Sequence, residues 1–84
     1  MTPRLPRGVR LRHDRVRSRW VLLAPERIFE VDDIGVAILQ RCDGRSLDQM
    51  LEDLSKTFEA PIEAIRGDVV SFLKGFAEKR VLEL

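Results

Sequence analysis

The chain has few of the residue types that carry covalent, metal or nucleotide chemistry. Its 84 residues include one cysteine, Cys42, and one histidine, His13. A single cysteine can form neither an intramolecular disulfide nor a multi-thiolate zinc site. The five glycines are scattered, so the sequence contains no glycine-rich phosphate loop and no dinucleotide fingerprint. We therefore expect no cofactor and no metal site.

Long apolar runs are missing as well. The longest run, Trp20 to Ala24, is far shorter than the roughly 20 residues of a membrane helix, and the arginine-rich start lacks the apolar segment of a signal peptide. With 44% hydrophobic and 35% charged residues, the composition is that of a soluble globular protein. The length allows one small domain with little room for an enclosed active site. We expect a cytoplasmic protein with no membrane partner.

Charge is distributed unevenly along the chain. The first 20 residues hold seven arginines and one aspartate, whereas the other 64 hold eight basic and 13 acidic side chains. A basic segment of this kind can attract an anionic partner, or it can be a solvated, partly disordered terminus. Because Pro3, Pro6 and Gly8 interrupt regular structure, the sequence predicts a flexible arm over residues 1–8 and a single domain over residues 9–84.

Three strands are predicted in the first part of the chain. Apolar and charged residues alternate over Val9 to Arg12, which is typical of a half-exposed strand. After a polar connection from His13 to Ser18, Trp20 to Ala24 suits a central strand. Pro25 and Glu26 predict a tight turn, and Arg27 to Val31 then form a third strand. Together they predict an antiparallel meander.

The pattern then changes to the helical period. Asp32 or Asp33 can cap a first helix, whose apolar stripe includes Ile34, Ala37, Ile38 and Cys42 and whose exit is Gly44. Ser46 and Gln49 have the spacing of a capping box at the start of a second helix, which runs to Phe58. A third helix begins at Pro61 and ends near Arg80. The expected fold is α+β and winged helix-turn-helix-like, with a three-stranded antiparallel sheet followed by three helices.

Isolated residues that carry chemistry elsewhere have structural explanations here. His13 lies in or near the arm, where a general base would lack rigid support. Cys42 continues an apolar stripe, and the adjacent Asp32 and Asp33 are explained by helix capping. Trp20 is expected to anchor the core rather than to stack on a ligand. No base or oxyanion partner can be named for a thiol-dependent transferase, so we expect no catalytic residue and no enzyme.

The stretch Arg19-Trp20-Val21-Leu22-Leu23-Ala24-Pro25-Glu26-Arg27, with the later Ala37-Ile38-Leu39 and Cys42-Asp43-Gly44, resembles the pyrroloquinoline quinone (PQQ) biosynthesis protein D family. The likeness extends from Arg10 to Val81-Leu82, with departures at Ser18 and Gly35. It implies a peptide chaperone that binds the ribosomally made PQQ precursor peptide. The family is thought to present this peptide to a radical S-adenosylmethionine (SAM) enzyme, which joins a glutamate to a tyrosine.

A peptide site is expected between the third strand and the third helix. The charges of Arg10 and Arg12 discourage pairing at the edge of the first strand, so the third strand is the more open edge. Strand addition requires unpaired backbone groups beside apolar side chains, and the family's binding mode uses the same two elements. The predicted peptide-binding residues are Arg27, Ile28, Phe29, Glu30 and Val31 of the strand and Asp68, Val69, Phe72, Leu73 and Phe76 of the helix.

The main alternative is a DNA-binding winged-helix protein. Its recognition helix would have to be basic, but residues 61–80 carry four basic and three acidic side chains, and the second predicted helix is more acidic still. Only the arginines of the N-terminal segment favour DNA. The sequence therefore favours a peptide partner and no nucleic acid.

Overall fold

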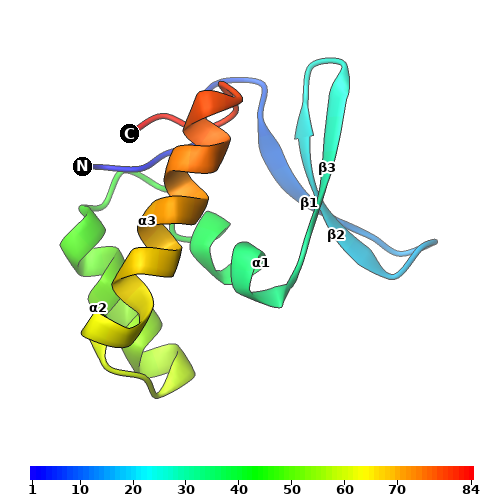
Figure 1. The fold of residues 1–84 in the computed structure, drawn as a ribbon. Helices are drawn as coiled ribbons and strands as arrows, with labels where there is room; N and C mark the ends of the chain where they lie inside the picture. Colours follow the sequence, from blue (N-terminus) through cyan, green and yellow to red (C-terminus); the bar gives the residue numbers. More distant parts are fainter.

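The computed structural model describes all 84 residues as a three-stranded sheet followed by three helices (Figure 1). The elements are β1 (Arg10–Asp14), β2 (Arg19–Ala24), β3 (Arg27–Val31), α1 (Asp33–Leu39), α2 (Leu47–Phe58) and α3 (Ile62–Glu78). The predicted α+β order is confirmed. None of the three helices combines the length and the apolar character that crossing a bilayer requires.

The sheet is an antiparallel meander in the order β1-β2-β3. Leu22 lies opposite Phe29, and the neighbouring residue Val21 lies opposite Glu30. Because side chains alternate along a strand, Leu22 and Phe29 share the face that packs on the helices, whereas Val21 and Glu30 share the outer face. Figure 1 shows the β1–β2 turn projecting away from the helical layer.

The first strand extends further than the sequence predicts. Asp14 ends it by accepting hydrogen bonds from the backbone N–H groups of Val16 (3.0 Å) and Arg17 (3.3 Å), and such Asx turns compete with extended structure. His13 is therefore a strand residue rather than part of a polar connection. Its ring lies 5.0 Å from that of Trp20, which packs partly buried against the core.

The first helix begins where predicted and ends earlier. Asp32 caps it, accepting a hydrogen bond from Gly35 N–H at 2.8 Å. The helix stops at Leu39 rather than at Gly44, because the N–H groups of Arg41 and Cys42 bond to carbonyls only three residues back, at 3.1 Å each. The Arg41 guanidinium also donates to the Ala37 carbonyl at 2.7 Å. Gly44 does have a positive φ of 94°, but it lies in the following loop.

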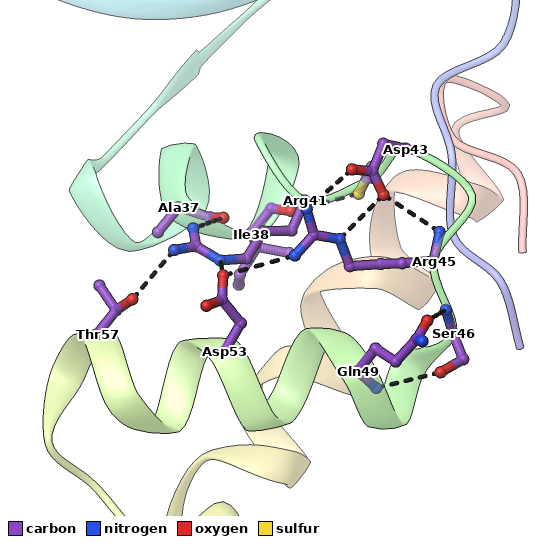
Figure 2. A network of polar contacts seen from close by, with 10 residues as sticks. Ala37, Ile38, Arg41, Asp43, Arg45, Ser46, Gln49, Asp53 and Thr57 are labelled. Atoms are coloured by element: carbon purple, nitrogen blue, oxygen red, sulfur yellow. Dashed lines mark hydrogen bonds and ion pairs between the residues drawn. The ribbon is translucent and has the colours of Figure 1, made fainter.

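Ion pairs hold the corner between α1 and α2, as Figure 2 shows. The guanidinium groups of Arg41 and Arg45 both reach Asp53 of α2, and Arg45 also pairs with Asp43 at 2.9 Å. Hydrogen bonds from Arg45 lower the pKa of Asp43 to about 2. The capping box of Ser46 with Gln49 stands beside them and begins α2 as predicted. Because these charged side chains pair with one another, the cluster has a structural role and stabilises the corner between α1 and α2.

The N-terminal segment differs from the flexible arm that the sequence predicts. Arg4 exchanges two backbone hydrogen bonds of 2.9 Å with Glu83, and the backbone of Met1, Pro3 and Leu5 bonds to the α1–α2 loop and the start of α2. The Pro3 side chain is fully buried. Pro3 and Pro6, which the sequence analysis treats as interruptions of regular structure, instead keep the segment extended. The extended segment crosses the molecule and joins the C-terminal residues to the α1–α2 loop (Figure 1).

One apolar core joins the sheet to the helices. Fourteen buried residues form it, and Leu22, Ile38, Met50, Leu51 and Leu73 are among the most enclosed. The core places β3 beside α3 with the far edge of β3 unpaired, because β3 hydrogen-bonds only to β2.

Candidate functional site

The open edge of β3 presents backbone groups at two residues. The β2–β3 hairpin closes with a two-residue turn, so Ala24 and Arg27 flank it as a pair. In such a hairpin the flanking pair exchanges hydrogen bonds and every second pair does so. Phe29 therefore bonds to β2, whereas the N–H and C=O groups of Ile28 and Glu30 point to the open edge. These are the groups that an added strand would use.

Side chains of β3 divide between two faces. Phe29 and Val31 point to the helices, where Val31 is buried and Phe29 is half-buried. Ile28 and Glu30 point to the outer face, where Ile28 is 65% exposed and Glu30 pairs with Arg19 at 3.2 Å. The five predicted strand residues thus form one backbone edge but not one side-chain surface.

Three aromatic rings line the space between β3 and α3. The Phe76 ring meets Phe29 edge-on at 5.5 Å and Phe72 at 4.8 Å between centroids. All three are half-buried. An open hollow of ≈ 450 Å³ lies beside them, bounded by Glu30, Val31, Asp32, Phe72 and Phe76. Rings that keep exposed edges next to free backbone groups can bind an extended, partly apolar peptide.

The remaining predicted residues have other positions. Val69 and Leu73 are 3% and 0% exposed, so their side chains belong to the core beneath the groove and are not accessible to a peptide. The Arg27 guanidinium lies over the Phe29 ring and donates to the Lys79 carbonyl at 2.7 Å. This contact joins the start of β3 to the end of α3 and closes one end of the groove.

A second hollow adjoins the first and was not predicted. Its volume is ≈ 380 Å³, and most of its lining residues are apolar, including Ile34, Phe58, Ile65 and Phe72, with Asp32 and Asp68 also contributing. Ile34 is 58% exposed and Phe58 is 42% exposed, although the helical pattern assigns both to the core. Helical period alone cannot distinguish a core position from a position on the wall of a groove.

Gly35 explains how the two hollows meet. A Cβ atom at this position would lie 3.1 Å from the Phe72 ring and 3.2 Å from the capping oxygen of Asp32. The glycine therefore allows the Phe72 ring to lie against the first turn of α1, where it forms a wall of both hollows. This requirement for close approach accounts for a residue that is unfavourable in a helix on propensity alone.

The nucleophile candidate is enclosed by the fold. Cys42 is buried, its Sγ–H donates to the Ile38 carbonyl at 3.4 Å, and burial raises the pKa of the thiol to about 12. A thiol with this pKa carries almost no thiolate at neutral pH. No group of three or more histidine, cysteine, aspartate or glutamate side chains is placed to hold a metal ion.

Comparison with known proteins agrees with this fold. The family model described as coenzyme PQQ synthesis protein D (PqqD) matches residues 19–82. A PqqA binding protein of Xanthomonas euvesicatoria is 48% identical over 83 residues, which cover 98% of this chain and 90% of that protein. The bifunctional coenzyme PQQ synthesis protein C/D of Methylorubrum extorquens is 52% identical over 82 residues, covering 96% of this chain and 22% of that longer protein.

Two solved structures are also similar. The solution structure of the PqqD truncation of Methylobacterium extorquens PqqCD, described as a stand-alone recognition element for ribosomally synthesized and post-translationally modified peptides, gives a TM-score of 0.84 at 50% identity. The match covers 99% of this chain and 89% of that one. The crystal structure of PqqD from Xanthomonas campestris gives 0.65 at 46% identity, with 100% and 94% covered. By sequence over most of its length and by fold, the chain belongs to the PqqD family of PQQ synthesis proteins.

Proposed function

We propose that this protein binds the PQQ precursor peptide as an added strand on β3 and presents it to the radical SAM enzyme of the pathway. The observation that carries the proposal is the open edge of β3, with the free backbone groups of Ile28 and Glu30 beside the aromatic row of Phe29, Phe72 and Phe76. Backbone pairing supplies affinity that depends little on sequence, and the rings select apolar side chains.

The names of the relatives support a peptide as the ligand. The Xanthomonas protein is named for binding PqqA, and the Methylobacterium domain is described as a peptide recognition element that works alone. In the bifunctional relative, the D unit is joined to a C unit, which supports an association with other proteins of PQQ synthesis. We propose that this chain acts in the cytoplasm, where a ribosomally made peptide is first available, and without catalysis of its own.

A proline at the open edge tests the binding mode. Glu30→Pro removes an N–H group that points away from β2, and proline is tolerated on edge strands in that orientation. A backbone hydrogen bond contributes about 1 kcal/mol net, so we expect peptide affinity to fall about fivefold to tenfold. Isothermal titration calorimetry with the synthetic precursor peptide measures the change.

Two control variants separate this effect from others. Glu30→Ala removes the carboxylate and its exposed ion pair but keeps the N–H group, so its affinity should stay within about twofold of wild type, because exposed pairs contribute little. Phe29→Pro removes a bond to β2 and an aromatic contact, so it should lower the denaturation midpoint itself. Strand addition is refuted if Glu30→Pro binds the peptide as well as Glu30→Ala does.

A further inference from the structure

The outer face of the sheet, turned away from the helices, carries most of the basic charge of the N-terminal segment. Arg12, Arg15, Arg17 and Arg19 line a hollow of ≈ 450 Å³ on this face. Arg10 lines an adjoining hollow of ≈ 430 Å³, and both hollows include Leu23. The outer face is defined by the β1–β2 turn, residues 15–18, and by the strand residues that point away from the helices: Arg10, Arg12, Asp14, Arg19, Val21, Leu23, Ile28 and Glu30.

The charge on this face is only partly neutralised within the chain. Arg17 and Arg19 pair with Asp14, and Arg19 also pairs with Glu30. Three further arginines, all exposed, form no ion pair in the structure: Arg10, Arg12 and Arg15. The face therefore keeps an excess of positive charge and of hydrogen-bond donors.

Apolar side chains lie between these arginines. Val21 is 5% exposed although it faces away from the core, because the surrounding long side chains cover it. Leu23 is half-buried, and Ile28 is exposed on the same face. An apolar centre with an arginine rim is a typical composition of a protein interface.

We propose that the outer face docks an acidic, partly apolar surface of the enzyme that modifies the captured peptide. The unpaired guanidinium groups call for carboxylates on the partner, and bidentate pairing with carboxylates is what arginine does best. Nucleic acid fits less well, because Asp14 and Glu30 share the face and the one large aromatic side chain of β2, Trp20, lies on the opposite face.

The position of this face permits two partners at once. Strand β3 separates the two surfaces: Phe29 and Val31 point to the groove, whereas Ile28 points to the outer face. A peptide in the groove would leave the outer face free, so one strand can hold the peptide and contribute to contact with the enzyme. This inference rests on the proposed function, since it requires that a peptide be captured for an enzyme.

Charge reversal on β1 tests the surface. The variant is Arg10→Glu with Arg12→Glu, and the control is Arg66→Glu with Lys74→Glu, which makes the same change in net charge on exposed positions of α3. The probes are the purified radical SAM enzyme and the precursor peptide, each titrated at about 0.1 M salt, where surface charges are only moderately screened. We expect the β1 variant to bind the enzyme at least tenfold more weakly and the peptide within twofold of wild type.

Other outcomes distinguish the inference from the proposed function. If the enzyme binds the β1 variant as it binds wild type, if the control loses the enzyme equally, or if wild type does not bind the enzyme, the outer face is not the docking surface. If the β1 variant loses binding to a DNA duplex in a mobility-shift assay but still binds the enzyme, the face would be assigned to nucleic acid. A wild-type dimer that only the β1 variant dissociates would assign it to a second copy. Failure of wild type to bind the peptide would instead refute the proposed function.

Discussion

Two helical glycines in this chain should respond to alanine in opposite directions. Gly35 lies in α1 and Gly67 lies in α3, and neither has a positive φ. On helix propensity alone, alanine should stabilise either helix by about 1 kcal/mol. A Cβ atom at Gly67 would meet nothing within 4 Å, so Gly67→Ala should realise most of this gain.

At Gly35 the surroundings oppose the gain. The added Cβ atom would lie 3.1 and 3.3 Å from two carbons of the Phe72 ring and 3.2 Å from the capping oxygen of Asp32. Overpacking of this kind costs about 1 to 3 kcal/mol, and a weakened helix cap costs about 1 kcal/mol more. After subtraction of the propensity gain, Gly35→Ala should destabilise the protein by about 1 to 3 kcal/mol. The two variants should then differ by about 2 kcal/mol or more, with Gly67→Ala the more stable.

Urea denaturation followed by circular dichroism measures both variants. The midpoints should move in opposite directions at an unchanged slope, and the melting temperatures should differ by about 10 °C for a domain of this size. Because the Phe72 ring lines the groove, Gly35→Ala should also weaken peptide binding, whereas Gly67→Ala should leave it unchanged. If Gly35→Ala stabilises the protein as Gly67→Ala does, the close approach of Phe72 to α1 is wrong.

Two further outcomes are expected. Deletion of residues 1–5 should lower the denaturation midpoint, because it removes the backbone hydrogen bonds between Arg4 and Glu83 and uncovers the site of Pro3. A midpoint equal to that of the full chain would instead support the prediction of a flexible arm. The Cys42 thiol has its pKa raised from 9.0 to about 12, so it should resist a thiol reagent in the native state. Its contribution to stability should be lost as the pH rises from about 9 towards 12, because in this range the thiol loses its proton in the unfolded chain but keeps it in the native protein. Rapid labelling of Cys42 in the native protein would contradict this burial. So would a Cys42→Ala variant whose free energy of unfolding falls with rising pH as steeply as that of wild type.

Local sequence determined the elements of the fold to a large extent. The turn at Pro25 and Glu26, the cap at Asp32 and the capping box that begins at Ser46 depend on contacts between residues within about four positions of one another. Strand β3 matches its predicted range for the same reason, because the turn and the cap bound it on both sides. Short-range hydrogen bonding is readable without the rest of the chain.

The sequence by itself also indicated the charge asymmetry and the family, but tertiary structure decided the surfaces. The sequence predicts that the segment around Pro3 and Arg4 is flexible, but its backbone hydrogen bonds to the distant residue Glu83 hold it against the domain. Likewise, Val69 fell within a predicted groove and Ile34 within a predicted core, because both satisfy the same helical period. Whether a helical position is enclosed or open depends on what packs over it, and here the surrounding residues come from other helices, an arrangement that no local pattern encodes.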